Sequence, residues 1–524
     1  MTGQPKEHPT QQEIQQEFLE RRRRIREKMG GVERIARQHA RGRMTIRERI
    51  DTLVDPGSFC ETGTFTASIR VQDRDLTPGD GKIGGWATID GRPVVVSGDD
   101  GTVMHGSSSV SASRRSDRLW EHALAYGMPY VYFGETGGAR LPDALGSEGH
   151  TNITPTVHAG QRARQFPMVT AICGESFGGS SFQAAYSDFV VQVRGTTMAV
   201  SSPRVIEVAI GEQVEFEELG GVDVHLEETG QIDCEAQSEE HACAILREFL
   251  SYLPSNAWEL PPELPFEGPM VPDPGILDIV PTKRNRGYDG RKLLKRLVDG
   301  EKYLELKPRF GPSLVTALAR IGGKSVGMLV SDPRFFAGAL SPQSCDKATA
   351  FICLCDSFNI PLVFLMDTPG FIVGKKAEHD RLLAKAIMMM EAVSKTMVPR
   401  ISVVIRKAFG LAYYAMSGNV SMGTDLALVW PGCELSFMDP DVGANVVYAK
   451  RIAGAPDPEE ERKRRIEEFS TGQDPYGAAQ VVNVDEIIDP AETRVVILNA
   501  LRRMRVTPPP KGQPRPLAHW PTCL

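Results

Sequence analysis

The residues of this chain best suited to chemistry lie in a glycine turn that follows an apolar run. The run Met168–Cys173 is typical of a buried strand, and GESFGGSS after it contains Gly178 and Gly179. Small residues let a ligand oxygen approach the backbone closely, and a helix that begins here would point free N–H groups at that oxygen. Two such amides form an oxyanion hole, which stabilises an enolate or a tetrahedral oxyanion. The alternative is that the glycines only allow close packing of strand and helix.

A second turn of the same kind occurs 232 residues further along the chain. The apolar run Ile401–Ile405 precedes RKAFGLAY, in which Gly410, Leu411 and Ala412 follow the apolar run as the glycines do in the first turn. One glycine turn is weak support for a catalytic role. The same turn in the same register twice favours two oxyanion holes, and therefore two carbonyl-like groups, one for each substrate.

Both turns belong to a longer internal repeat. MPYVYFGETGG (128–138) aligns with IPLVFLMDTPG (360–370), and FPMVTAICGESFGG (166–179) aligns with VPRISVVIRKAFGL (398–411). All of these pairs have the offset of 232, which holds over about 50 residues. The chain is therefore interpreted as two copies of one unit.

A proline-rich stretch separates the two copies. Seven prolines lie between Pro254 and Pro274, which is typical of a linker and predicts an N-terminal domain over 1–255 and a C-terminal domain over 275–524. In each copy a helical segment precedes the first of two buried strands, Ser111–Tyr126 in the first copy and Ser344–Phe358 in the second. This alternation predicts an α/β fold.

Composition and charge are those of a globular protein with no affinity for nucleic acid. Of the 524 residues, 41% are apolar and 24% are charged; the net charge is -7 and the pI is about 5.9. The basic run Arg21–Arg24 lies in a segment with helical spacing, about 11–43, which is interpreted as a solvated amphipathic helix. A nucleic-acid-binding arm is the alternative for this segment.

Membrane and metal sites are not predicted. No window reaches the roughly 18 consecutive apolar residues of a membrane span, and the polar N-terminus does not resemble a signal peptide, so the cytoplasm is the expected location. Nine cysteines are scattered without a CxxC pair, which indicates neither a zinc ribbon nor a disulfide framework. No metal is expected on this chain.

No other catalytic set competes with the glycine turns. The motifs GxSxG, HExxH and GxxxxGK[ST] are not placed to work. Three lone histidines, at 105, 150 and 225, are interpreted as structural or surface residues. Asp188 and Asp367 lie near strand ends, where they would act as acids or bases or, as is more common, form turns.

The sequence resembles the carboxyltransferase (beta) subunits of biotin-dependent acyl-CoA carboxylases, the propionyl-CoA and methylcrotonyl-CoA carboxylase family. The resemblance extends over roughly residues 17 to 505. Its motifs are HARGRMTIRERIDTLVDPGSF (39–59), GDGKIGGWATIDGRPV (79–94), GGAR (137–140), FEELGG (216–221), CDSFNIPLVFLMDTPGFIVG (355–374) and RKAFG (406–410). Together they are highly specific, whereas GGAR alone is not.

The resemblance implies two tandem crotonase-like domains related by duplication, and active sites at a dimer interface. The first domain of one subunit would bind acyl-CoA and the second domain of its neighbour would bind biotin, usually within a hexamer formed as a trimer of dimers. The chain has no AMKM-like biotinylation site and no nucleotide-binding domain. Biotin carboxylase and the biotin carboxyl carrier are therefore expected on another polypeptide, which carries the biotin.

The resemblance also assigns roles to residues. Gly178 and Gly179 would hold the thioester oxygen of acyl-CoA as an enolate; Leu411 and Ala412, next to Gly410, would hold the ureido oxygen of biotin. Further substrate-binding positions are Gly137, Gly138, Ala139, Arg140, Ser180, Phe371 and Tyr414. Carboxybiotin would release CO2, the biotin enolate would remove the acyl α-proton, and the acyl enolate would attack CO2. The protein would supply positioning and charge stabilisation, with no protein nucleophile.

Several positions depart from the family pattern. The usual PCAGGAVYSP is ESFGGSSFQA, with Glu175 in the place of proline, and the usual GGAYDVM is GLAYYAM, with Tyr414 in the place of an aspartate. The usual DFTVFGGS is DDGTVMHGSS (99–108). These changes leave the acyl group undetermined. Alternative functions are the carboxyltransferase subunit of a biotin-dependent decarboxylase or transcarboxylase, a non-catalytic scaffold for a biotin enzyme, and a biotin-independent CoA hydrolase or isomerase.

Overall fold

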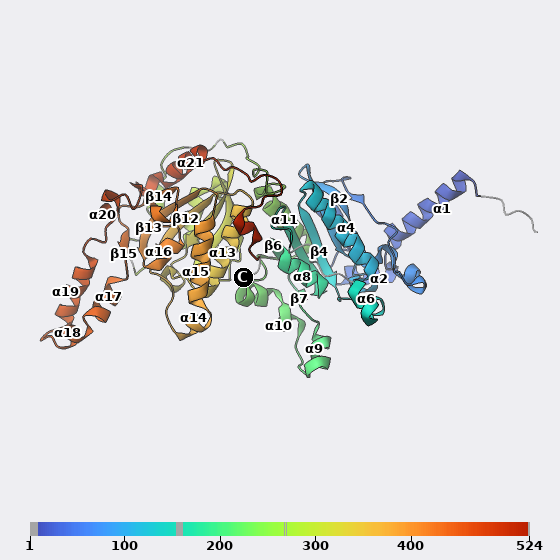
Figure 1. Ribbon diagram of the computed structural model, residues 1–524, viewed down its shortest axis with the longest axis horizontal. Helices are drawn as coiled ribbons and strands as arrows, with labels where there is room; N and C mark the ends of the chain where they lie inside the picture. The colour runs from blue at the N-terminus through green and yellow to red at the C-terminus, as the bar shows by residue number, and fades with distance from the viewer. Residues whose placement is uncertain (1–8, 153–160, 267, 269, 284, 522–524) are drawn as a thin grey trace, which may run out of the picture. The chain divides into compact units, whose positions relative to one another are not determined.

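A computed structural model describes residues 9–152, 161–266, 268, 270–283 and 285–521. It divides into two compact units, drawn from blue to red along the chain in Figure 1. Unit 1 is Met1–Arg162, Phe166–Val224 and Glu235–Arg247; unit 2 is Ala163–Gln165, His225–Cys234 and Glu248–Leu524. Each unit is thus made of three separate stretches of the chain. The two domains predicted from the sequence, 1–255 and 275–524, are each one continuous stretch, and their boundaries stay a prediction.

The first unit is built on one sheet of eight strands among the residues described. Their order is β1-β2-β3-β4-β5-β6-β8, and β7 pairs with β5. The pairs β1–β2 and β2–β3 are antiparallel, whereas β3, β4, β5 and β6 run parallel. The strands are β1 Cys60–Glu61, β2 Lys82–Ile89, β3 Arg92–Asp99, β4 Tyr130–Thr136, β5 Met168–Phe177, β6 Phe189–Val193, β7 Thr197–Ala199 and β8 Cys234–Ala236.

The second unit repeats this topology. Its order is β9-β10-β11-β12-β13-β14-β16, with β15 paired to β13, and again an antiparallel start is followed by parallel strands. The strands are β9 Tyr303–Leu306, β10 Leu314–Ile321, β11 Lys324–Ser331, β12 Leu362–Thr368, β13 Arg400–Phe409, β14 Leu426–Val429, β15 Glu434–Ser436 and β16 Glu486–Ile487. The duplication predicted from the 232-residue offset is confirmed.

The helices connect these strands in the expected alternation. Those of unit 1 are α1 Gln11–Arg23, α2 Val32–Ala40, α3 Ile46–Leu53, α4 Val110–Tyr126, α5 Leu141–Ala144, α6 Gly146–Asn152, α8 Gly179–Tyr186, α9 Pro203–Ile210, α10 Phe216–Gly220 and α11 Glu239–Tyr252. Those that begin in unit 2 are α12 Gly290–Leu297, α13 Pro342–Ser357, α14 Lys375–His379, α15 Leu382–Lys395, α16 Leu411–Ala415, α17 Pro440–Val447, α18 Ala449–Ala453, α19 Pro458–Ser470, α20 Pro475–Gln480 and α21 Thr493–Arg503. The predicted helices that precede β4 and β12 are α4 and α13.

The N-terminal segment is helical but not continuous. After α1 comes a π-helical turn, Arg24–Lys28, and the backbone then turns left-handed at Met29 (φ 43°) and Gly31 (φ 105°) before α2. A single helix over about 11–43 is therefore wrong, because this left-handed stretch cannot continue a right-handed helix.

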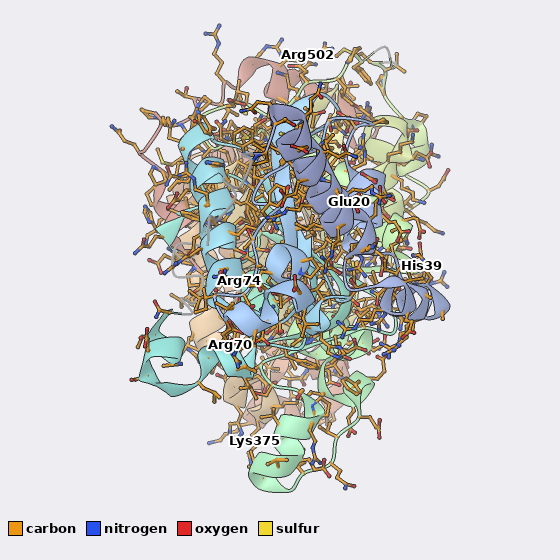
Figure 2. All side chains as sticks on the ribbon, turned by 90° about the vertical axis from the view of Figure 1, so that its right-hand side faces the viewer. Glu20, His39, Arg70, Arg74, Lys375 and Arg502 are labelled. Carbon is orange, nitrogen blue, oxygen red and sulfur yellow. The ribbon has the colours of Figure 1, made fainter. Side chains whose placement is uncertain are left out.

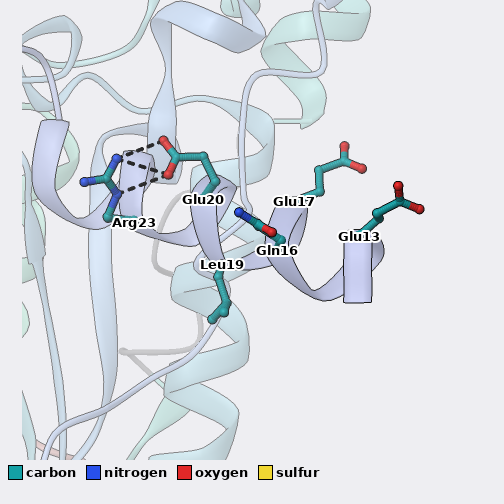
Figure 3. Close-up of a pocket in the computed structure, with 6 residues that line it drawn as sticks. All are labelled: Glu13, Gln16, Glu17, Leu19, Glu20 and Arg23. Carbon is teal, nitrogen blue, oxygen red and sulfur yellow. Dashed lines mark hydrogen bonds and ion pairs between the residues drawn. The ribbon is translucent and has the colours of Figure 1, made fainter. Parts of the chain in front are cut away.

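Most of the basic run Arg21–Arg24 is exposed, and two of its four arginines pair with acidic residues of α1. Arg21 pairs with Glu17, and Arg23 pairs with Glu20, as Figure 3 shows for the second pair. Figure 2 shows Glu20 and His39 on the outer surface of the molecule, on α1 and α2. This pairing at helical spacing is what a solvated face of a helix requires.

Candidate functional site

The first glycine turn joins β5 to α8 with the geometry expected of an oxyanion turn. Gly178 has φ 63° and ψ -118°, a conformation that a residue with a Cβ rarely adopts, and α8 begins directly after it. The Gly178 N–H donates to the carbonyl oxygen of Val200 at 3.2 Å. The first N–H of this turn that is available to a ligand therefore belongs to Gly179, at the start of the helix.

The second glycine turn repeats this geometry between β13 and α16. Gly410 has φ 61° and ψ -151°, and its N–H donates to the carbonyl oxygen of Ser436 at 3.0 Å. The first N–H left for a ligand belongs to Leu411. The Gly410 and Gly178 amides are thus both used by the fold, and the helix residue after each glycine occupies the ligand-facing position.

In unit 1 a second loop lies beside the turn. It follows β4 and contains Gly137, Gly138 and Ala139. The Gly138 N–H donates to Thr136 Oγ1 at 3.1 Å, and the Gly138 carbonyl accepts from the Ser108 N–H at 2.9 Å. A Cβ on Gly138 would lie 3.9 Å from the Phe177 carbonyl oxygen, so this loop borders the end of β5.

Unit 2 contains the same loop after β12. The Gly370 N–H donates to Thr368 Oγ1 at 3.3 Å, and the Gly370 carbonyl accepts from the Leu340 N–H at 3.0 Å. A Cβ on Gly370 would lie 3.9 Å from the Phe409 carbonyl oxygen. Phe371 therefore corresponds to Ala139, and the predicted residues of each unit come together at one end of its sheet.

Each unit thereby presents free backbone amides from both of its loops. Within the part of the chain that the structure describes, the N–H groups of Ala139, Gly179, Phe371 and Leu411 donate to no protein acceptor. Two converging amides without partners are the donor set that an oxyanion requires. The bonds made by the neighbouring glycines hold both loops in place.

A cavity of about 360 Å³ opens at the loops of unit 1. Gly178 and Gly179 line it together with Ala139, three of the residues predicted from the sequence. The other lining residues come chiefly from β4, α4 and α8: Lys82, Ser108, Ser113, Ser116, Asp117, Tyr130, Tyr132, Ala144, His150, Phe182 and Gln183. The site is therefore a walled pocket rather than an open turn.

Lys82, the cation in this cavity, is neutralised by a buried carboxylate of the same unit. Lys82 forms a buried ion pair with Asp99 and also donates to the Gly106 carbonyl oxygen at 3.2 Å. The Tyr132 hydroxyl donates to Asp99 at 2.8 Å. Burial, and then the nearby Asp99, raise the pKa of Tyr132 well above its usual value, so this phenol stays protonated.

Two predicted substrate-binding residues turn their side chains away from the cavity. Arg140 is 3% exposed and donates to Asp80 at 2.5 Å and to the Ser107 carbonyl oxygen at 3.1 Å. Ser180 is 1% exposed, and its Oγ lies 3.3 Å from Ser176 Oγ. Both side chains hold the loops together, and direct contact of either with substrate stays a prediction.

The predicted residues of unit 2 differ in exposure. Leu411 is 46% exposed at the start of α16, whereas Ala412 is fully buried. The ring of Tyr414 is half-buried and packs edge-on against Tyr413, with 5.3 Å between the centroids. A ligand can reach Leu411 from solvent, and the Ala412 side chain packs inside the unit.

The two strand-end aspartates are held by contacts within the fold. Asp367 is fully buried between Arg406, at 2.9 Å, and Lys407, at 2.7 Å. Asp188 pairs with Arg162 and accepts from the Met168 N–H at 2.9 Å. The interpretation of these residues as structural agrees with these contacts.

The histidines separate into buried and exposed groups. His225 is buried, with Nδ1 2.9 Å from Thr229 Oγ1, whereas His150 is exposed and lines the cavity of unit 1. His105 has a left-handed backbone (φ 54°), and its carbonyl accepts from the Gly137 N–H at 3.0 Å. His150 is thus the one of the three that borders the candidate site.

Glu175 does not reach this cavity. It lines a separate cavity of about 340 Å³ with Arg41 and Arg43, and it pairs with Arg43 at 3.0 Å. Burial raises the pKa of Glu175, but the hydrogen bond and charge of Arg43 outweigh this, so the pKa lies below its usual value. The Glu175 departure therefore alters a different surface from the one beside Gly179.

The sequence did not identify the walls of the cavity. The spacing of the residues does indicate which of them share a face. Gly179 and Gln183 are four residues apart on one helix, and Tyr130 and Tyr132 are two residues apart on one strand. Ser113, Ser116 and Asp117 share one face of α4. Each pattern is common by itself, and only the packing of three elements makes it a site.

Neither a cluster of metal ligands nor a membrane-spanning helix occurs among the residues that the structure describes. No cluster of three or more His, Cys, Asp or Glu side chains that could hold a metal ion was found there. No helix in the same part is long and apolar enough to span a bilayer.

Comparison with known proteins gives a consistent result. A family model described as the carboxyl transferase domain matches residues 37–510. The methylmalonyl-CoA carboxyltransferase 12S subunit of Propionibacterium freudenreichii subsp. shermanii is 38% identical over 93% of each chain. A putative propionyl-CoA carboxylase beta chain of Bacillus subtilis (strain 168) is 33% identical over 92% of this chain and 95% of that protein.

Solved structures are similar over the whole chain. The transcarboxylase 12S crystal structure, described as a hexamer assembly with methylmalonyl-coenzyme A and methylmalonic acid bound, superposes with a TM-score of 0.89 at 36% identity, and the match covers 98% of this chain and 99% of that one. A single-chain, multi-domain long-chain acyl-CoA carboxylase matches with a TM-score of 0.81 at 28% identity, over 94% of this chain and 49% of its own.

Proposed function

Because this chain belongs to the carboxyl transferase domain family and consists of two tandem crotonase-like units, we propose that it transfers a carboxyl group from carboxybiotin to an acyl-CoA. The observation that supports this proposal best is the duplicated pair of free amides, Ala139 with Gly179 in unit 1 and Phe371 with Leu411 in unit 2. Two substrates with one carbonyl oxygen each match two holes.

We assign the acyl thioester to unit 1. Its cavity beside Gly179 has room for an acyl chain, and the Ala139 and Gly179 amides would stabilise the negative charge on the thioester oxygen when the α-proton leaves. Tyr132 and Lys82 are already bonded to Asp99, so neither is free to remove that proton. The chain's own contribution is orientation and electrostatic stabilisation.

We assign biotin to unit 2, and the residues there fit it. Leu411 is exposed, and its N–H and that of Phe371 have no protein acceptor among the described residues, so both can donate to a ureido oxygen. Carboxybiotin, when bound, supplies the CO2 and a base for the α-proton. A separate carrier protein would deliver it, and a homo-oligomer, as in the hexameric 12S structure, would be the working form.

Reconstitution tests the proposal directly. The full chain is mixed with a biotinylated carrier, biotin carboxylase, ATP and radiolabelled bicarbonate, and a panel of acyl-CoA thioesters is screened for acid-stable label. Carboxylated acyl-CoA is expected, and avidin should prevent its formation. If the carrier becomes carboxylated but no acyl-CoA is labelled, the proposal is wrong.

A second candidate is transfer from one acyl-CoA to the carrier without ATP. The 38% identity to a methylmalonyl-CoA carboxyltransferase subunit favours it, as does the 33% identity to the methylmalonyl-CoA decarboxylase alpha subunit of Propionigenium modestum. In this case the chain, carrier and carboxyl-labelled methylmalonyl-CoA suffice to label the carrier. The same holes would serve both directions, so only the partner proteins distinguish the two functions.

A further inference from the structure

In unit 1 one residue interrupts the pairing of the two strands that lead to the free amides. The register between β4 and β5 shifts between Gly134 and Thr136, so Glu135 alone lies opposite residues 173–175 of β5. An extra length on one strand of a pair bends that strand and increases its local twist, and such bulges are common beside active sites. The strand that leads to the glycine turn therefore changes course opposite Glu135.

Unit 2 has the same interruption. The register between β12 and β13 shifts between Met366 and Thr368, so Asp367 lies opposite residues 405–407. Glu135 and Asp367 are 232 residues apart, which is the offset of the repeat. Beyond the shift β5 pairs with β7, and β13 pairs with β15. The interruption is thus a feature of the repeated unit.

The interruption lies directly before both loops that present the amides. Thr136 follows Glu135 and accepts from the Gly138 N–H, and the Ala139 amide comes next. On the other strand, β5 ends two residues after the extra residues, and the turn to Gly179 follows. The register at Glu135 therefore sets how the amides of the two loops lie relative to each other.

In unit 2 the interrupting acid is held by the extra residues themselves. Asp367 is fully buried, and each of its two carboxylate oxygens has its own cation: Oδ1 lies 2.7 Å from Lys407 Nζ, and Oδ2 lies 2.9 Å from Arg406 Nη2. Both cations belong to residues 405–407. The carboxylate therefore joins β12 to the extra length of β13.

In unit 1 the acid packs on the extra residues and is held by helices. A Cβ on Gly174 would lie 2.5 Å from Glu135 Cγ, so only glycine fits beneath this side chain. The carboxylate accepts from Gln38 Nε2 at 2.7 and 2.8 Å and pairs with Arg49 at 2.7 Å. The side chain is buried, so these contacts fix Glu135 against β5.

We propose that Glu135 and Asp367 are positioning residues, each of which holds the interrupted strand pair and thereby aligns the free amides of its own unit. The inference rests on the proposed function, which assigns the thioester oxygen to the amides of unit 1 and the ureido oxygen to those of unit 2. An oxyanion is stabilised only when its donors point at it, and a displacement of about 1 Å can cost 10²-fold in rate.

Glu135→Gln and Asp367→Asn test this role, because the new NH2 group must face one of the donors that held the carboxylate. The probes are propionyl-CoA, isotope-labelled at the thioester carbonyl, and biotin, isotope-labelled at the ureido carbonyl. Infrared spectra of the full chain with each probe bound measure how strongly the amides polarise that carbonyl. Both bands should shift to lower wavenumber on binding to the unmodified chain.

Each variant should change one band only. Glu135→Gln should lose the shift of the thioester band and keep that of the ureido band, and Asp367→Asn should do the reverse, so each variant is the matched control for the other. A loss of stability alone would not produce this crossed pattern. The kcat of carboxylation should fall by about 10²-fold in both variants, whereas the KM for acyl-CoA should change little.

A conservative variant guards against misfolding in unit 1. Glu135→Asp keeps the charge that pairs with Arg49 but shortens the side chain by one methylene, so the fold should persist. Its thioester band should keep part of the shift, and its kcat should lie between those of the unmodified chain and Glu135→Gln. Thermal melting identifies any variant whose fold has changed, and Glu135→Asp then decides the question for unit 1.

The outcomes separate this inference from the proposed function. If both bands shift in the unmodified chain and the variants keep both shifts, the proposed function holds and the positioning role is wrong. A folded variant that loses both shifts also overturns the role, because the effect is then not confined to its own unit. If neither band shifts in the unmodified chain, the assignment of the two carbonyl groups fails, and this inference fails with it.

Discussion

At the scale of single residues, the proposed reaction depends on backbone amides rather than side chains. The glycines at 178 and 410 adopt positive φ and donate their own N–H groups to the neighbouring strand. In the proposed reaction the donor is the N–H of the next residue in each turn, which is glycine in one unit and leucine in the other. Side-chain identity matters little there, because the donor belongs to the backbone.

Replacing that residue with proline deletes the donor itself. Gly179→Pro places proline at the first position of α8, where helices tolerate it, so the fold should persist. The carboxylation kcat/KM should fall by about 10²–10³, as for loss of one oxyanion donor. Gly179→Ala is the matched control: its Cβ meets nothing closer than Ser108 Oγ at 3.9 Å and the amide remains, so most activity should survive. Equal losses in both variants would remove the amide from the mechanism.

Asp100 in unit 1 makes a residue-scale prediction about pH. Oδ1 accepts from the Thr102 N–H at 3.0 Å, but Oδ2 has no partner among the described residues, and burial raises the pKa of this carboxyl group to about 6. Between pH of about 4 and 6 the folded state then binds more protons than the unfolded state, so its stability falls as the pH rises. The free energy lost by pH 8 is about 3 kcal/mol, and about half of it is lost by pH 5.

Asp100→Asn should remove this dependence. The free energy of unfolding of the variant, relative to that of the unmodified chain, should increase by about 1.5 kcal/mol between pH 5 and pH 8, as urea titrations would measure. The comparison between two pH values cancels any constant effect of the amide. The exposed Asp51→Asn should show no such trend, and a parallel pair of pH profiles for Asp100→Asn would contradict the assignment.

At the scale of elements, each unit buries a carboxylate near the end of its central strand, but the cations come from different places. In unit 2, Asp367 on β12 pairs with Arg406 and Lys407 of the adjacent β13. In unit 1, the equivalent Glu135 pairs with Arg49 of α3 at 2.7 Å. In unit 1, helix α3 thus supplies a cation that pairs with the buried carboxylate. In unit 2, the adjacent strand of the same sheet supplies the cations.

This difference predicts unequal effects of removing one cation. Arg49 is fully buried and also pairs with Glu239 at 2.8 Å, so Arg49→Met leaves two buried carboxylates without it and should cost about 3–5 kcal/mol in the free energy of unfolding. Lys407→Met leaves Asp367 still paired with Arg406 and should cost clearly less. Urea denaturation of both variants measures this, and a larger loss for Lys407→Met would refute the argument.

The sequence could predict features that lie in one continuous segment, but not contacts between segments that are far apart in the chain. The apolar runs, the glycine turns and the 232-residue repeat are signals along the chain, and they identified four central strands and both turns. The cavity walls and the Arg140–Asp80 pair were missed, because they join segments that are far apart in sequence. The break at Met29 was missed although the Gly30–Gly31 pair beside it is a turn signal, because the helical spacing on either side suggested one continuous helix.

At the scale of the whole molecule, the proposed function gives each unit of the duplicated chain one half of a site, and the family resemblance implies that a working site combines the first unit of one chain with the second unit of its neighbour. Gly179→Pro and Leu411→Pro delete the corresponding amide in the two units. Each variant alone should be inactive. In a randomly mixed population half of the dimers contain one of each variant, and one of the two sites in such a dimer is intact, so co-expression should restore about a quarter of the normal activity.

A site contained within one chain gives the opposite result. Every chain in the mixture then carries one damaged half-site, so co-expression should restore no activity at all. Affinity tags that differ between the two variants allow the mixed oligomers to be isolated, and their specific activity should approach half of normal, because one site in each mixed dimer is complete. The purified mixed oligomer should therefore be inactive if both units of one chain form the same site. It should have about half of the normal activity if the two units of one chain belong to two different sites.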